Sequence, residues 1–129
     1  MNITYKSDQI VDVVREKVLP LLGKYRVITL SGSVGAGKTT LVKELLRQAG
    51  VGDLVTSPTF AYVNSYKTPI GRQIYHFDLY RIESLESFMM NGFDEYLYDD
   101  ASVCLIEWPE VLGDLLQAAS IKRQVCQVA

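Results

Sequence analysis

Hydrophobic positions in the first part of the chain predict a helix, a buried strand and a second helix. Ser7 or Asp8 can cap the first helix, and Pro20 is expected to end or kink it. Its apolar residues recur at helical spacing: Ile10, Val11, Val14, Val18 and Leu21 or Leu22. The apolar run Val27–Leu30 indicates a buried strand. Leu41, Leu45 and Leu46 then share one face of a helix that Gly50 can end.

Strand-like and turn-like segments alternate in the next part of the chain. Residues 61–66 and 73–79 favour strands, and residues 67–72 between them have turn chemistry. An antiparallel hairpin is predicted, because parallel pairing needs a crossover of about a dozen residues. Residues 84–90 are expected to form a helix that breaks at Asn91-Gly92, with Met89 and Met90 filling the core.

A carboxylate follows a second run of apolar residues. Residues 103–106 are apolar and Glu107 comes next, which predicts a buried parallel strand with an acid at its C-terminal end. Residues 74–78 include the polar His76, so this strand is expected to be half-exposed and alternating, and it ends in Asp78. After Pro109, three leucines suggest a short helix, and residues 121–128 suggest a last strand.

A phosphate-binding loop pattern joins the first strand to its helix. It reads Gly32-Ser33-Val34-Gly35-Ala36-Gly37-Lys38-Thr39. Its glycines allow backbone amides to point inward at phosphates, and the helix that begins near Lys38 adds the positive end of its dipole. The Lys38 ammonium should reach the β- and γ-phosphates, while the Thr39 hydroxyl should ligate Mg²⁺. The alternative is a tight strand-to-helix turn that binds nothing.

The elements together predict one α/β domain over residues 1–129 with the three-layer fold of P-loop NTPases. A mostly parallel central sheet would carry the antiparallel hairpin as an insertion, with helices on both faces. At 129 residues the chain has room for one core and few accessory parts. Two cysteines form no disulfide framework, and Cys104 lies in an apolar run that favours the core.

Charge and hydropathy narrow the possible partners. Thirteen basic and fifteen acidic residues give a net charge of −2, and no run is rich in Lys or Arg. Unaided binding of RNA is therefore disfavoured, because phosphate contacts supply most of the non-specific affinity. No stretch approaches the roughly 18 apolar residues of a membrane span, and the N-terminus lacks the pattern of an export signal. A cytoplasmic protein without membrane contact is expected.

Two acids at predicted strand ends are candidates to complete a nucleotide site. Glu107 is preferred as a metal ligand and Asp78 as a residue that orients water. The alternatives are a solvated strand end for Glu107, and a turn cap or a salt bridge to Arg81 for Asp78. His76 is interpreted as a structural histidine. Trp108 can be either a contact or packing, and Thr59 can either sense phosphate or bond its own turn.

The motifs, taken in their order along the chain, resemble those of the TsaE family, which is also called YjeE. The members of this family are small P-loop ATPases of bacterial tRNA threonylcarbamoyladenosine modification. The resemblance rests on residues 31–41, Thr56-Ser57-Pro58-Thr59-Phe60, Tyr75-His76-Phe77-Asp78-Leu79-Tyr80-Arg81 and Cys104-Leu105-Ile106-Glu107-Trp108. It covers nearly the whole chain. Ser33-Val34 depart from the family's usual acid and leucine, which removes a carboxylate near the phosphates, and the C-terminal end looks shorter than usual.

The resemblance implies an ATPase of low intrinsic activity that joins TsaB and TsaD and uses ATP and Mg²⁺. Transfer-RNA would be contacted only indirectly, through that complex. Lys38, Thr39 and Thr40 would lie at the phosphates, Thr39 and Glu107 would hold the metal, and Asp78 and Trp108 would complete the active centre. The segment around Thr59 would respond to the nucleotide. A small-molecule kinase and a module that binds ATP without cleaving it are the competing interpretations.

Overall fold

A five-stranded sheet forms the centre of the protein in the computed structural model, which describes residues 6–32, 37–52, 62–117 and 125–128. The strand order is β2-β3-β4-β1-β5. The strands are β1 (Val27–Leu30), β2 (Val63–Lys67), β3 (Gln73–Asp78), β4 (Ser102–Glu107) and β5 (Val125–Val128). The sequence therefore places the strands correctly, including the final one within residues 121–128.

Strand directions confirm the predicted hairpin and parallel sheet. β2 pairs with β3 in antiparallel fashion, whereas β3–β4, β4–β1 and β1–β5 are parallel pairs. Leu30 is aligned with Glu107, and Glu107 with Asp78. The carboxyl ends of β1, β3 and β4 thus meet at one edge of the sheet, which is where ligands bind in open α/β sheets.

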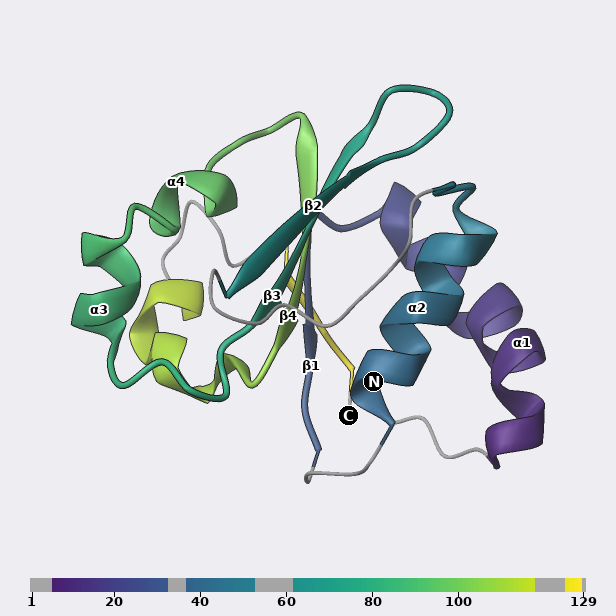
Figure 1. Cartoon of the computed structure of the whole chain (residues 1–129), viewed down its shortest axis with the longest axis horizontal. Helices are drawn as coiled ribbons and strands as arrows, with labels where there is room; N and C mark the ends of the chain where they lie inside the picture. The colour runs from purple at the N-terminus through teal and green to yellow at the C-terminus, as the bar shows by residue number, and fades with distance from the viewer. Residues whose placement is uncertain (1–5, 33–36, 53–61, 118–124, 129) are drawn as a thin grey trace.

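Helical segments pack on both faces of the sheet (Figure 1). One face carries η1 (Ser7–Gln9), α1 (Ile10–Val13), η2 (Val14–Val18), η3 (Leu19–Gly23) and α2 (Lys38–Gln48). The opposite face carries α3 (Leu85–Met90), α4 (Asp94–Leu97) and η4 (Pro109–Gln117). Each face has its own buried cluster of apolar side chains, which matches the strict alternation of side chains along the strands.

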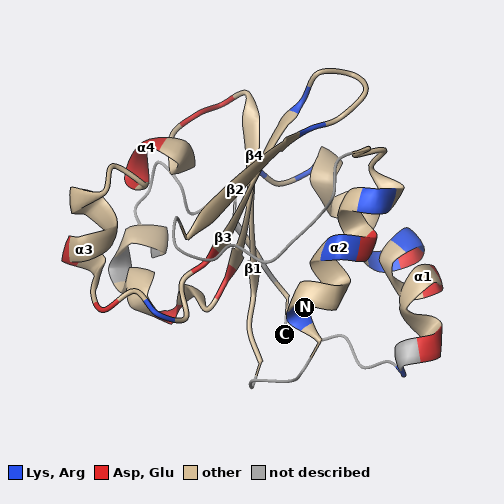
Figure 2. Ribbon diagram, in the orientation of Figure 1, with Lys and Arg blue, Asp and Glu red and all other residues tan. Residues whose placement is uncertain are grey.

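Charged side chains are distributed unevenly over these two faces (Figure 2). Acidic residues predominate around α3 and α4, whereas most basic residues lie on α1, α2 and the hairpin formed by β2 and β3. The α3–α4 side is therefore less suited to bind the phosphates of RNA than the opposite side. Within the described part of the chain, no helix is long and apolar enough to cross a membrane.

The N-terminal helix differs from its prediction in its cap and its winding. Neither Ser7 nor Asp8 is the capping residue, because the first turn follows Lys6, whose N–H donates to Gln9 Oε1 at 2.9 Å. The winding widens to a π-helix in η2 and tightens to a 3₁₀-helix in η3, where Pro20 occupies the first turn. Proline has no N–H to donate, so a change in hydrogen bonding at this point is expected.

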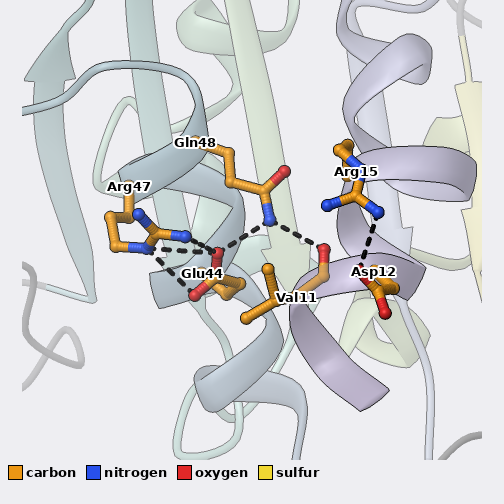
Figure 3. Close-up of polar contacts among 6 residues, drawn as sticks. All are labelled: Val11, Asp12, Arg15, Glu44, Arg47 and Gln48. Atoms are coloured by element: carbon orange, nitrogen blue, oxygen red, sulfur yellow. Dashed lines mark hydrogen bonds and ion pairs between the residues drawn. The ribbon is translucent and has the colours of Figure 1, made fainter.

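Side-chain hydrogen bonds attach α2 to α1 (Figure 3). Gln48 Nε2 donates both to the Val11 carbonyl at 2.9 Å and to Glu44 Oε2 at 2.7 Å. Arg47 in turn donates to the same carboxylate, with a shortest distance of 2.6 Å. The hydrogen bond from Arg47 is the main reason that the pKa of Glu44 lies below its ordinary value of 4.5.

Burial in the core confirms most of the apolar pattern and corrects one part of it. Leu41, Leu45 and Leu46 of α2 are buried, as predicted. Met89 and Met90 are not core residues, because they are 46% and 80% exposed. The helix α3 is only six residues long and Phe88 is its buried residue, so the two methionines that follow Phe88 point away from the sheet.

Candidate functional site

Gly37, the last glycine of the phosphate-loop pattern, is described together with the helix that follows it. Gly37 caps α2 with φ of 84°, a left-handed conformation that favours glycine, and its carbonyl accepts the N–H of Leu41 at 2.9 Å. The first turn of α2 therefore begins at Lys38. The predicted loop residues Ser33, Val34, Gly35 and Ala36 lie outside the described residues, as does Thr59, so their roles stay predictions.

The structure brings the two predicted metal ligands together. Thr39 Oγ1 donates to Glu107 Oε1 at 2.9 Å, although 68 residues separate them in the sequence. Glu107 is 2% exposed, so the alternative of a solvated strand end is wrong. A buried carboxylate needs hydrogen-bond partners, and Thr39 is one of them.

Lys38 and Trp108 also meet at this edge of the sheet. Lys38 Nζ donates to the Gly32 carbonyl at 2.6 Å and lies 3.5 Å from the centroid of the Trp108 ring. Trp108 has φ of 59°, an uncommon value for a residue other than glycine. Its ring also packs on the ring of Tyr80, with 4.9 Å between the two ring centroids. Trp108 therefore contacts Lys38 and also packs on Tyr80, and its role in an active centre stays a prediction.

Asp78 lies beside Glu107 but is held by its own turn. The two acids are aligned in the β3–β4 pair, and the N–H of Leu79 donates to the Glu107 carbonyl. Asp78 Oδ1 accepts the N–H of Tyr80 at 3.1 Å, so it caps the turn that follows β3. Its role in orienting water stays a prediction. Thr40 is exposed on the first turn of α2.

The sequence interpretation missed His76. The expectation of a half-exposed strand is wrong at this position, since His76 is fully buried and its Nε2 lies 2.5 Å from Glu107 Oε2. The spacing of His76 and Asp78 could have indicated that they belong to one site. They are two residues apart on one strand, so their side chains face the same side of the sheet. Pairing them with Glu107 additionally required the register between β3 and β4.

The arrangement suits a magnesium ion bound together with a phosphate chain. Thr39 and Glu107 offer hard oxygen donors, which Mg²⁺ prefers, and Lys38 offers a cation for phosphate oxygens. No group of three or more His, Cys, Asp or Glu side chains that could hold a metal occurs among the described residues.

Comparison with known proteins gives a family match over most of the chain. Residues 5–128 match the family described as "Threonylcarbamoyl adenosine biosynthesis protein TsaE". The chain is 42% identical over 95 residues to the Haemophilus influenzae protein named "tRNA threonylcarbamoyladenosine biosynthesis protein TsaE", covering 74% of this chain and 59% of that protein.

Two further relatives carry the same name. The Borreliella burgdorferi protein is 39% identical over 113 residues, covering 86% of this chain and 80% of the relative. The Bacillus subtilis protein is 38% identical over 90 residues, covering 70% and 54%. The matches to the Haemophilus and Bacillus proteins thus span less than two thirds of those proteins. With a family match that extends over nearly all its residues and these similarities, the chain belongs to the TsaE family.

Proposed function

We propose that this protein is a Mg²⁺-dependent ATP-binding and ATP-hydrolysing subunit of tRNA threonylcarbamoyladenosine biosynthesis. The observation that carries the proposal is the 2.9 Å contact between Thr39 Oγ1 and Glu107 Oε1 at the start of α2. In a P-loop site the hydroxyl and an acid from a neighbouring strand hold the metal of the metal–nucleotide complex. A ligand-free turn would not require this contact with a buried acid.

Each predicted residue has a place in the proposed site. Gly32, Ser33, Val34, Gly35, Ala36, Gly37 and Thr40 would surround the phosphates with backbone and hydroxyl donors. Lys38 would neutralise phosphate charge, Thr39 and Glu107 would hold Mg²⁺, and the metal would supply charge stabilisation during phosphoryl transfer. Asp78 and Trp108 would border the reacting phosphate, and Thr59 would sense the nucleotide state. The sheet and its helices would form a three-layer P-loop NTPase domain.

Partner proteins are a further part of this proposal. We infer that it acts with TsaD and TsaB in the cytoplasm and contacts tRNA only through them, since the α3–α4 side is acidic and the net charge is −2. Intrinsic hydrolysis would be slow, because a cation supplied in trans raises phosphoryl-transfer rates by about 10³–10⁵. Partners would stimulate it.

A small-molecule kinase is the competing function, and the structure supports it less. Such an enzyme needs an acceptor pocket, for which the segment between Arg81 and Ser102 is the available material. In this segment Phe88 of α3 and Leu97 of α4 are fully buried in the core beneath the sheet. Two of its larger apolar side chains therefore serve packing. Efficient ATP-dependent phosphorylation of a nucleoside or sugar would favour the kinase.

Calorimetry of three forms of the protein tests the proposed metal site. The wild type should bind MgATP more tightly than ATP in EDTA. Thr39→Val, which keeps the shape without the hydroxyl, should lose about tenfold or more in the Mg²⁺-dependent part of the affinity. Thr39→Ser keeps the hydroxyl and is the matched control. If the folded wild type gives no heat with MgATP, the proposal is refuted.

A second measurement tests the proposed partnership. ATP hydrolysis by the protein alone should be low and should rise when TsaB and TsaD are added. Lys38→Ala should abolish both the stimulated hydrolysis and the formation of threonylcarbamoyladenosine on tRNA. Unchanged tRNA modification by this variant would contradict the assignment of Lys38, because the ammonium is the cation aimed at the phosphates.

A further inference from the structure

The Glu107 carboxylate is held from two sides by different residues. Its Oε1 accepts the Thr39 hydroxyl at 2.9 Å, and its Oε2 lies 2.5 Å from His76 Nε2. Both His76 and Glu107 are essentially removed from solvent, with 0% and 2% exposure. The two contacts together fix which carboxylate oxygen faces α2, because either one alone would leave the group free to rotate.

The hydrogen-bonding state of His76 follows from this geometry. Because an ionised carboxylate can only accept, we assign the Nε2–H tautomer to His76, with Nε2 donating to Glu107 Oε2. The other ring nitrogen, Nδ1, is buried and has no hydrogen-bond partner among the described residues. Within the described segments the ring therefore makes one polar contact, and that contact is with the candidate metal ligand.

A purely structural role explains this arrangement poorly. Buried polar atoms are normally satisfied, and an unsatisfied one in a native protein calls for an explanation. Ile74, two residues earlier on the same face of β3, fills an equivalent core position at 1% exposure with an apolar side chain. An apolar residue at position 76 would avoid the unpaired nitrogen, so the hydrogen bond to Glu107 is the feature that the histidine adds.

Asp78 is not the residue that His76 serves. Asp78 is on the same strand, but its carboxylate accepts the N–H of Tyr80 within the turn after β3. Residues that ligate metals are commonly oriented by outer partners, and loss of such a partner costs about 10- to 100-fold in metal affinity. His76 has the burial and contact distance of such a partner for Glu107.

We propose that His76 is a positioning residue whose Nε2–H holds the Glu107 carboxylate toward Thr39 and so sets the affinity of the site for Mg²⁺. This rests on the proposed function, in which Thr39 and Glu107 hold the metal. His76 touches neither substrate nor metal in this role. It acts through the orientation of one carboxylate.

Substitutions of His76 by side chains of different length distinguish this positioning role from a role in core packing. His76→Gln keeps an N–H donor near the position of Nε2, whereas His76→Asn is polar but too short to reach Glu107. Ile74→Ala is the matched control, because it damages the same core without touching the carboxylate. Mn²⁺ is used as a probe for Mg²⁺, and its binding in the presence of the non-hydrolysable nucleotide AMP-PNP is measured by electron paramagnetic resonance. The affinity for the nucleotide in EDTA is measured in parallel.

The expected result is a 10- to 100-fold weaker Mn²⁺ affinity in His76→Asn, recovery to within a few fold in His76→Gln, and no change in Ile74→Ala. Nucleotide affinity in EDTA should stay within about twofold throughout, because the phosphate loop itself is intact. Wild-type Mn²⁺ affinity in His76→Asn, or an equal loss in Ile74→Ala, overturns the proposal. If Thr39→Val weakens Mn²⁺ binding while His76→Asn does not, the proposed function stands and only the positioning role fails.

Discussion

The ammonium of Lys38 lies 3.5 Å from the ring centroid of Trp108, the single tryptophan of the chain. An ammonium at this distance interacts with the indole ring electrostatically. In the proposed function the same ammonium also reaches for phosphates, so binding of a nucleotide must alter the surroundings of the indole. The tryptophan is therefore placed to report on the site.

We expect a saturable change in tryptophan fluorescence when MgATP is titrated into the protein. Lys38→Met, which removes the charge and keeps the apolar stem, should bind MgATP about 10- to 100-fold more weakly, because a hydrogen bond to a charged group contributes about 1.5–3 kcal/mol. The same titration and calorimetry measure both effects. A wild type that binds MgATP by calorimetry without any change in emission would contradict the predicted shift of Lys38.

Gly50 ends α2 in a conformation that only glycine adopts easily, and it leaves no room for a side chain. Its φ is 90°, and a Cβ added there would lie 2.8 Å from Pro69 Cγ. Gly71 has a similar φ of 86° with nothing within 4 Å of an added Cβ. Gly71→Ala should therefore cost about 1–2 kcal/mol of unfolding free energy from backbone strain, and Gly50→Ala about 1–3 kcal/mol more from the clash.

Chemical denaturation of four variants checks this prediction. Gly50→Ala, Gly71→Ala, Pro69→Ala and the double variant at positions 50 and 69 are compared with the wild type. The double variant should recover part of the cost of Gly50→Ala, because the clashing ring is absent. Equal costs for the two glycine variants would show that the contact between Gly50 and Pro69 does not limit stability.

The acid sensitivity of the protein should depend on Glu44. Hydrogen bonds from Arg47 lower its pKa from 4.5, so the folded state binds this proton less readily than the unfolded chain does. The stabilisation from ionised Glu44 is present above about pH 4.5 and is lost as the pH falls through the lower folded pKa. Glu44→Gln should be less stable at pH 7, and the difference should shrink toward pH 3.

Thermal unfolding between pH 3 and pH 7 measures this effect. Glu16→Gln is the control, because the Glu16 carboxylate is 66% exposed and lies 3.7 Å from Arg15. Surface pairs of this kind contribute little, so its stability should follow that of the wild type. If the difference in stability between Glu44→Gln and the wild type is the same at every pH, the stabilisation does not depend on the ionisation of Glu44.

Cys104 should resist thiol reagents in the folded protein. Burial raises the pKa of its thiol to about 12, and its Sγ contacts the Tyr96 carbonyl at 3.4 Å. At pH 8 about one thiol in ten thousand is then ionised, and the thiolate is the reactive form. Mass spectrometry after brief treatment with iodoacetamide should find Cys104 unmodified in the native protein and modified in denaturant. Equal modification in both states would contradict the burial of β4.

Local chemistry is what made the start of α2, the hairpin and the strand ends predictable. The loop pattern, the start of α2 at Lys38 and the hairpin depend on residues close together in sequence, where backbone conformation and spacing decide the outcome. Glu107 was recognisable because four apolar residues precede it on one strand. These features needed no knowledge of which elements pack together.

Long-range packing decided the rest. Only the register of β3 against β4 buries His76 beside Glu107, and only the docking of α2 brings Thr39 to the same carboxylate. The placement of α3 likewise exposes Met89 and Met90, which a count of apolar residues assigned to the core. Sequence alone thus indicated Lys38, Thr39 and Glu107 and the helix and strand that carry them. Their mutual contacts and burial depend on pairs of residues far apart in the chain, which only the tertiary structure brings together.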